Sequence, residues 1–194
     1  MRKKILIINS HPDAKSFNYA LSKRYILGAK TSGADIKIID LYKLDFKPFF
    51  RGIEHENIIE EDIKNAQLLL KWANHIVFFY PIWWATFPAL LKSFLERVLV
   101  PGFSNENSNT DREFIQWHEL LSGKTARLIV TMDSPPLFHI IKVKQPSYRT
   151  MKDILKFCGI NSTKKTYLGS VKMSDENQRK LWLDKVEKMG KQNK

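Results

Sequence analysis

Residues 75–96 read HIVFFYPIWWATFPALLKSFLE, and this stretch decides the fold. Residues 76–80 form an apolar, β-rich run, which predicts a strand buried on both faces, as in a parallel sheet. Pro81 ends the predicted strand, and apolar residues recur at helical spacing from Phe87 onward. The adjacent Trp83 and Trp84 therefore follow the carboxyl end of a buried strand, where open α/β sheets bind ligands. This loop suits a flat aromatic cofactor; the alternative is that both indoles pack in the core.

Working outward, the same alternation of strand and helix patterns covers the chain. Strands are predicted at 4–9, 35–40, 76–80, 126–132 and 165–168, and helices at about 16–31, 58–74, 87–97 and 151–157, with a last helix capped by Ser174. This order predicts an α/β fold: a doubly wound five-stranded parallel sheet, order 2-1-3-4-5, with helices on both faces. No repeat or low-complexity linker interrupts it, so we expect one domain over residues 1–194. The topology places the loops at 10–16 and 81–85 side by side, next to the loop after strand four.

Composition narrows the class of protein. Net charge is +12, and residues 142–194 carry 9 of these charges. A basic segment indicates either nucleic-acid binding or a solvated surface that attracts phosphate-bearing ligands, and the absence of a nucleic-acid-binding motif favours the second. The single Cys158 excludes an internal disulfide and favours a reducing compartment. With no signal peptide and no apolar run of ~20 residues, we expect a cytoplasmic protein with no nucleic-acid partner and no membrane insertion. No metal site is predicted.

The first predicted loop carries polar groups at the start of a helix. Residues 11–18 read HPDAKSFN, which is neither a glycine-rich dinucleotide loop nor a P-loop. Free backbone N–H groups at a helix start favour an anion, and His11 and Lys15 add donors. Ser16 is either part of such an anion site or only the N-cap of the helix. Phosphate at this loop and an aromatic ring at the indole loop are the two parts of a flavin.

The chain resembles the flavodoxin-like NAD(P)H quinone dehydrogenase family. The matching segments are HPDAKSFNYAL, YPIWWATFPALLKSFLERVLVPGF, LLSGKTARLIVT, and ILKFCG followed by YLGSV, in the family's order. The resemblance implies a bound flavin, either FAD or FMN, with NAD(P)H as co-substrate and a quinone-like acceptor. It also implies a homodimer in which a neighbour's loop completes the site, and the long connection at 100–122 is the candidate for that loop. Cys158, inside the FCG match, is then structural.

The resemblance also implies roles for particular residues. The segment that binds flavin phosphates corresponds to His11, Ser16, Phe17 and Asn18. The loop that holds the isoalloxazine ring corresponds to Pro81, Ile82, Trp83 and Trp84. The loop that bonds the ring's pyrimidine edge corresponds to Thr131, Met132, Asp133 and Ser134.

Two departures from the family lie after strand four. Asp133 and two prolines replace a glycine-rich turn, and proline removes N–H donors. An ionised Asp133 beside the ring would oppose charge on reduced flavin, so we expect its carboxylate to point away and to cap its own turn. Animal members carry a Tyr and, six residues later, a His over the flavin; here Phe138 and Lys144 stand at those positions. His139, out of that register, is the candidate catalytic residue; the alternative is a surface loop histidine.

The resemblance and the residues together predict a flavin-dependent oxidoreductase. NAD(P)H and the acceptor would use one stacking site in turn, a ping-pong cycle, and the flavin carries the hydride chemistry. Two alternatives stay open: a flavin-bound accessory subunit of a transporter, and a one-electron carrier of flavodoxin type.

Overall fold

The computed structural model describes residues 2–50, 59–99 and 121–193. Its centre is a sheet of five parallel strands in the order β2-β1-β3-β4-β5. This confirms the predicted fold class and strand order, including the edge position of the second strand. The strands are β1 (Lys4–Asn9), β2 (Asp35–Asp40), β3 (His75–Pro81), β4 (Thr125–Thr131) and β5 (Ser162–Leu168).

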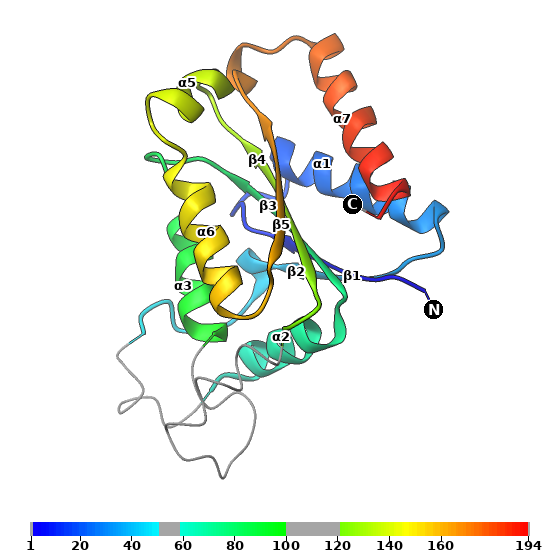
Figure 1. The fold of residues 1–194 in the computed structure, drawn as a ribbon, viewed down its shortest axis with the longest axis vertical. Coiled ribbons are helices and arrows are strands. Elements are labelled where there is room, and N and C mark those ends of the chain that lie inside the picture. Colours follow the sequence, from blue (N-terminus) through cyan, green and yellow to red (C-terminus); the bar gives the residue numbers. More distant parts are fainter. Residues whose placement is uncertain (1, 51–58, 100–120, 194) are drawn as a thin grey trace.

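Helices cover both faces of the sheet, because alternate side chains of the central strands are apolar in both directions. In β1, Ile5 and Ile7 pack on one face, while Leu6 and Ile8 pack on the other. Figure 1 shows α1 and α7 on the first face and α2, α3 and α6 on the second. Their bounds are α1 (Phe17–Thr31), α7 (Glu176–Lys191), α2 (Glu61–Trp72), α3 (Ala89–Val98) and α6 (Pro146–Phe157). None of the described helices is long and apolar enough to span a bilayer.

Several element ends differ from the sequence-based prediction. Pro81 belongs to β3 as its last residue instead of lying after the strand. Proline is tolerated there because the end of the strand needs no further N–H donor. The N-cap of α7 is Asp175, whose carboxylate accepts the N–H of Gln178 at 2.7 Å, and not Ser174. β5 begins at Ser162 and α6 at Pro146, both earlier than predicted. The first residues of this edge strand and of this helix are largely polar, so no apolar pattern marks either start.

A short helix, α5 (Pro136–Ile141), was not expected from the sequence. The pair Pro135-Pro136 looks like a break, but proline at the first position of a helix loses no hydrogen bond. Here Pro135 is the N-cap and Pro136 opens the helix, and His139 donates its N–H to the carbonyl of Pro135 at 3.2 Å. The chain after β4 therefore continues into a helix beside the predicted site.

Candidate functional site

Three loops meet at the carboxyl edge of the sheet, as the strand order requires. Ser10, just after β1, donates its N–H to the carbonyl of Phe79 in β3 at 2.9 Å. Ile82, just after β3, donates its N–H to the carbonyl of Thr131 in β4 at 2.7 Å. The Asn18 amide, in the first turn of α1, donates to the Thr131 hydroxyl at 2.7 Å. These bonds fix the three predicted loops against one another.

The first loop holds buried polar groups that have no partner in the described part of the chain. They are the Ser10 hydroxyl, the Ser16 hydroxyl and the side-chain carbonyl of Asn18. Ser16 occupies the N-cap position of α1, yet its hydroxyl makes no capping hydrogen bond. Because buried polar groups are rarely left unpaired, this cluster is typical of a site that pairs with a ligand. Ser10 was missed by the sequence reasoning; its position directly after a buried strand was the available signal.

The start of α1 favours an anion at this cluster. The first bonds of the helix are donated by Tyr19 and Ala20 to the carbonyl of Ser16, so the N–H groups of Phe17 and Asn18 precede them. The first turn contains no acidic residue. Free N–H groups and the positive end of the helix dipole both attract negative charge.

His11 lies between the first loop and the indole loop. Its Nδ1 accepts the N–H of Asp13 at 2.9 Å, so the neutral ring carries its proton on Nε2. Its ring stands edge-on to the Trp83 indole, with centroids 5.4 Å apart. Burial lowers the pKa of His11 below its usual value, against a smaller opposite effect from Asp13. At neutral pH this histidine is therefore an uncharged donor.

We predict that an anionic ligand changes this titration. Without ligand, His11 should titrate below pH 6.5, because burial disfavours the charged ring. A bound phosphate favours the charged form, so the pKa of His11 should rise when FMN is added, and the affinity for FMN should increase as pH falls through that range. NMR titration of the imidazole signals measures both values, with riboflavin as the ligand that lacks phosphate. Equal pKa values with FMN and with riboflavin would contradict a phosphate next to His11.

The indole loop is a tight turn that displays its aromatic side chains. Trp83 and Thr86 exchange backbone hydrogen bonds of 2.9 and 3.1 Å, and the two residues between them have positive φ angles, 49° at Trp84 and 67° at Ala85. Trp84 is fully exposed and Trp83 is 43% exposed. The alternative that both indoles pack in the core is therefore wrong. Within the described chain, the fully exposed Trp84 leaves the flat face of its indole available, as ring stacking requires.

The turn also stores backbone strain, which gives a stability prediction. Turns of this kind normally use Asn-Gly, because residues with a Cβ cost about 1–2 kcal/mol at positive φ. Ala85→Gly should raise the free energy of unfolding by about 1 kcal/mol, after the added entropy of glycine in the unfolded chain is deducted. Denaturant unfolding measures this change. Ala20→Gly, inside α1, is the matched control and should instead lower stability by about 1 kcal/mol; a similar loss for both variants would show that the turn is unstrained.

The loop after β4 is already largely bonded within the protein. The Met132 N–H donates to the carbonyl of Leu168 at 2.9 Å, and the Asp133 carboxylate accepts the N–H of Lys172 at 3.2 Å. Asp133 thus turns to the loop after β5, and the expectation that it caps its own turn is wrong. Within the described residues, the N–H groups of Asp133 and Ser134 make no backbone hydrogen bond, and the two prolines that follow have no N–H to offer a ring edge.

The prolines have a packing reason on the neighbouring loop. A Cβ at Gly169 would lie 2.4 Å from the Pro136 ring and 2.6 Å from the carbonyl of Ser134. A side chain at 169 would therefore clash with the loop after β4, so glycine allows the loops after β4 and β5 to pack against each other.

His139 lies inside the protein rather than on a surface loop. It is 1% exposed, in α5, with its ring edge-on to Tyr167 at 5.5 Å. Burial and the nearby Lys165 ammonium lower its pKa, so the ring is neutral. The surface-loop alternative is wrong, and the neutral, enclosed ring holds α5 against β5. We therefore assign no step of a reaction to His139.

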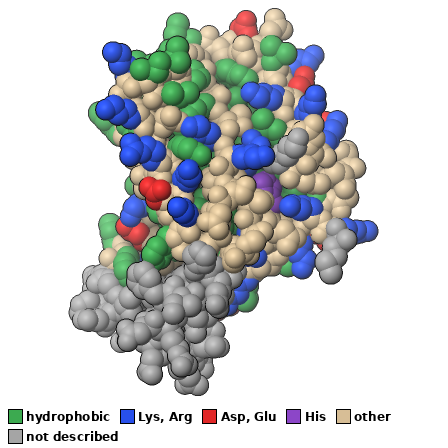
Figure 2. Space-filling view, in the orientation of Figure 1, with side chains coloured by type: hydrophobic (Ala, Val, Ile, Leu, Met, Phe, Trp, Pro, Cys, Tyr) green, Lys and Arg blue, Asp and Glu red, His purple; other side chains and the backbone are tan. Residues whose placement is uncertain are grey.

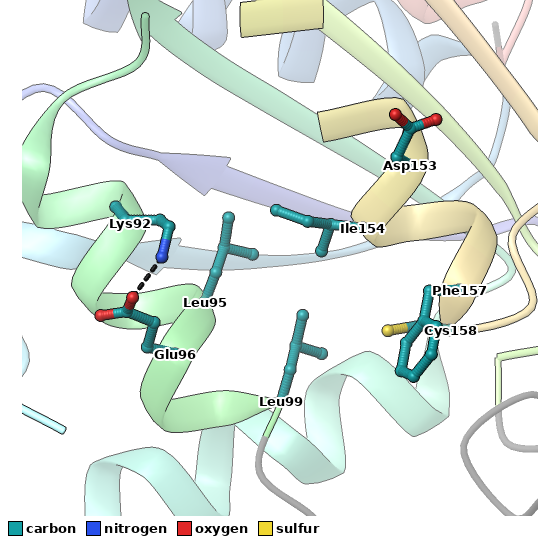
Figure 3. A pocket seen from close by; sticks show the side chains of 8 residues that line it. All are labelled: Lys92, Leu95, Glu96, Leu99, Asp153, Ile154, Phe157 and Cys158. Atoms are coloured by element: carbon teal, nitrogen blue, oxygen red, sulfur yellow. Dashed lines mark hydrogen bonds and ion pairs between the residues drawn. The ribbon is translucent and has the colours of Figure 1, made fainter. Parts of the chain in front are cut away.

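The described residues line cavities both near the three loops and away from them. One, of about 440 Å³, borders the loop after β5 and Trp182, whose indole is 6.0 Å from the Phe17 ring of the first loop. The other, of about 410 Å³, lies between the carboxyl-terminal halves of α3 and α6, away from the three loops (Figure 3). Leu95, Leu99 and Ile154 point into it. Cys158 lines this second cavity, and burial raises the pKa of its thiol to about 11, so it is not a reactive thiolate.

The residues at the three loops fit a phosphate-bearing aromatic cofactor. Unpaired hydroxyl and amide groups stand at a helix start, and two available indoles stand on the neighbouring turn. The described residues contain no group of three or more side chains able to hold a metal ion. This arrangement matches the class of flavin-binding α/β proteins.

Comparison with known proteins gives the family. The family model for the flavodoxin-like fold matches residues 3–191, and the chain belongs to this family. An uncharacterized NAD(P)H oxidoreductase of Haemophilus influenzae is 28% identical over 92% of this chain and 90% of its own. The mouse ribosyldihydronicotinamide dehydrogenase [quinone] is 27% identical over 93% and 87%. The structure of an FMN-dependent NADH-azoreductase of Bacillus anthracis, in complex with FMN, superposes with a TM-score of 0.73 at 17% identity, over 98% and 99% of the two chains.

Proposed function

We propose that this chain is a flavin-dependent NAD(P)H oxidoreductase that passes reducing equivalents to a quinone or a similar small acceptor. The observation that carries the proposal is the set of unpaired, buried polar groups at the start of α1, next to an indole turn that leaves its ring faces available. The names of the Haemophilus and mouse relatives support the same class of reaction. The flavin, when bound, supplies the hydride chemistry.

The protein's own residues have three tasks in this proposal. Ser10 and Ser16 bind the phosphate through their hydroxyl groups and Asn18 through the second N–H of its amide nitrogen, with the N–H groups of α1 and neutral His11 as further donors. Trp83 and Trp84 wall the ring and exclude water from one side, and the N–H groups of Asp133 and Ser134 reach its polar edge. Reductant and acceptor then use the remaining side in turn, which is a ping-pong cycle.

The space beyond the phosphate supports a choice between the two flavins. FMN ends at its phosphate, whereas FAD continues into a nucleoside. The cavity bordered by Trp182, next to Phe17, offers a place for that nucleoside, so we favour FAD. Chromatography of the cofactor released by heat distinguishes the two.

We further propose that the chain works as one domain over residues 1–194, in the cytoplasm and as a homodimer. The buried thiol of Cys158 suits a reducing compartment. The segment expected to complete a neighbour's site, 100–122, lies almost wholly outside the described residues. Light scattering of the purified protein measures the oligomeric state, and a monomer at micromolar concentration would contradict the dimer.

Steady-state kinetics test the activity. With NADH, NADPH or dihydronicotinamide riboside as reductant and a soluble naphthoquinone as acceptor, we expect quinone-dependent oxidation of at least one reductant. Double-reciprocal plots at several quinone concentrations should give parallel lines. An azo dye is a useful second acceptor, because three structural neighbours are named azoreductases. Bound flavin without turnover on any pair would contradict the enzyme and favour the accessory subunit or the one-electron carrier.

A further inference from the structure

Within a single chain, the short helix α5 buries one side chain, that of His139. The ring meets Tyr167 of β5 edge-on, with centroids 5.5 Å apart. Its Nε2 is buried and has no hydrogen-bond partner within the described residues. Because its own chain already encloses the ring, neither a ligand nor a second copy of the protein reaches Nε2 unless α5 moves. The contact between α5 and β5 therefore depends on an imidazole that has no way to pair a second N–H.

A positive charge acts on this enclosed ring. Lys165 of β5 lowers the pKa of His139, in addition to the larger effect of burial. The Lys165 ammonium lies 3.9 Å from the centre of the Tyr148 ring. The tyrosines of the neighbouring strands, Tyr80 and Tyr167, are neutral at physiological pH, because burial raises the pKa of both phenols. A proton on His139 would thus add a second buried cation beside the first.

Among the described residues, no carboxylate offsets this charge at His139. Residues 137–172 contain eight Lys or Arg and a single acidic residue, Asp153, which lines the cavity between α3 and α6. Asp133, just before α5, accepts the N–H of Lys172 instead. Figure 2 shows many Lys and Arg side chains and few acidic ones on the face that carries α5 and α6. The charged imidazole is therefore stabilised by water and not by a partner in this part of the chain.

The turn after α5 is strained in the closed position. Lys144 and Gln145 both have positive φ angles, 61° and 55°, which residues with a Cβ rarely adopt. The Gln145 N–H donates to the carbonyl of His139 at 3.2 Å, and its side-chain carbonyl accepts a hydrogen bond from Lys165. These bonds hold the turn in place while α5 rests on β5. The strain is released when α5 leaves the strand, which favours an open form.

We propose that α5 is an acid-sensitive flap: protonation of His139 moves the helix away from β5 and into water. Figure 1 shows α5 at the end of the sheet where the candidate site lies. The preceding residues Asp133 and Ser134 belong to the loop after β4, so an open flap shifts that loop as well. The effect on a bound flavin rests on the proposed function, whereas the opening itself does not.

The direction of the pH dependence follows from the open form. In water His139 has its ordinary pKa of 6.5, whereas the closed form binds the proton less readily. The closed position is therefore fully stable above that pH, and it loses stability as the pH falls below it. Opening on acidification, and not on alkalinisation, is the expected behaviour.

Hydrogen exchange of the full-length protein as purified, followed by mass spectrometry, tests the flap. After correction for the intrinsic exchange rate, protection of residues 136–146 should fall about tenfold between about pH 7.5 and about pH 5. Peptides from β1 and β3 should keep their protection over the same range. His139→Phe keeps an aromatic ring that cannot take a proton, so its α5 should be equally protected at both pH values.

Lys165→Met separates charge from packing. This variant loses the hydrogen bond to Gln145, so α5 should be less protected at both pH values. Without the neighbouring cation, however, the fall on acidification should shrink from about tenfold to about threefold, and the pKa of His139 should rise in an NMR titration. The matched control is Lys164→Met, at an exposed lysine on the other face of the same strand, which should keep the tenfold fall and the parent's pKa.

The proposal is overturned if α5 of the parent is equally protected at both pH values, or if His139→Phe opens on acidification as the parent does. Should His139→Phe leave α5 unprotected even at neutral pH, the lysine pair decides, and the same pH dependence in Lys165→Met and Lys164→Met overturns the proposal. Loss of protection in β1 and β3 together with α5 also overturns it, since the whole chain then unfolds. The quinone assay tests the proposed function separately, because none of these results requires a bound flavin.

Discussion

A chain with Ser16→Ala and Asn18→Ala should bind FMN or FAD about 100-fold more weakly than the parent, and riboflavin about equally well. The Ser16 hydroxyl at the start of α1 is buried and has no partner in the described chain. The Asn18 amide nitrogen gives one N–H to the Thr131 hydroxyl and has a second N–H that can be donated to a phosphate. A hydrogen bond to a charged group contributes about 1.5–3 kcal/mol, so the loss of two corresponds to a factor of about 100 or more. Riboflavin lacks the phosphate, so it reports any general damage to the site. Equal losses of affinity for all three ligands, measured by fluorescence titration, would contradict a phosphate site at this loop.

The stability of the unliganded Ser16→Ala chain provides the control. Replacing a helix-capping serine with alanine lowers the free energy of unfolding by about 1 kcal/mol. The Ser16 hydroxyl makes no capping bond, so this variant should lose less than about 0.5 kcal/mol. Asp175→Ala, at the N-cap of α7, is the matched comparison, because that carboxylate does accept the N–H of Gln178. It should lose about 1 kcal/mol in the same denaturant experiment.

Trp84→Ala should weaken flavin binding by about 5–150-fold, with the fold unchanged. The loss of one stacking face corresponds to roughly 1–3 kcal/mol. The side chain is fully exposed, so its removal breaks no packing in the described chain. Alanine has the same preference against positive φ as tryptophan, so the strain of the turn is retained.

Trp84→Phe separates stacking from shape. Phenylalanine keeps an aromatic face and should recover most of the affinity. Isothermal calorimetry of the three proteins with the same flavin gives the affinities, and melting temperatures show whether the fold is retained. A Trp84→Ala protein that binds flavin as tightly as the parent would rule out a stacking role for this indole.

The sheet could be predicted because its signals are local. Apolar runs such as those of β1 and β3 specify strands buried on both faces, and their alternation with helices allows few topologies. The strand order then brings the loops after β1, β3 and β4 together without any knowledge of side chains. This reasoning placed both indoles and Ser16 on these loops. It did not decide whether the indoles are exposed or whether the Ser16 hydroxyl caps the helix.

What could not be predicted depends on contacts between distant residues. Asp133 bonds the backbone of Lys172, 39 positions later, and no local pattern indicates that partner. His139 is buried because α5 exists, and α5 was hidden by two prolines that more often end a structure than begin one. The Ser10 hydroxyl is buried without a partner in the described chain, and its burial depends on residues distant in the sequence. Each of these follows from tertiary packing, which sequence periodicity does not report.

The central claim is that the loops after β1, β3 and β4 together form a flavin site. Titration of the flavin-free protein with FAD and FMN, followed by flavin fluorescence, tests it most directly. The account predicts saturable binding of at least one of them, with fluorescence quenched by the stacked indoles and with tighter binding than riboflavin. Unquenched flavin fluorescence without saturation, up to protein concentrations well above those used for the quinone assay, would contradict it.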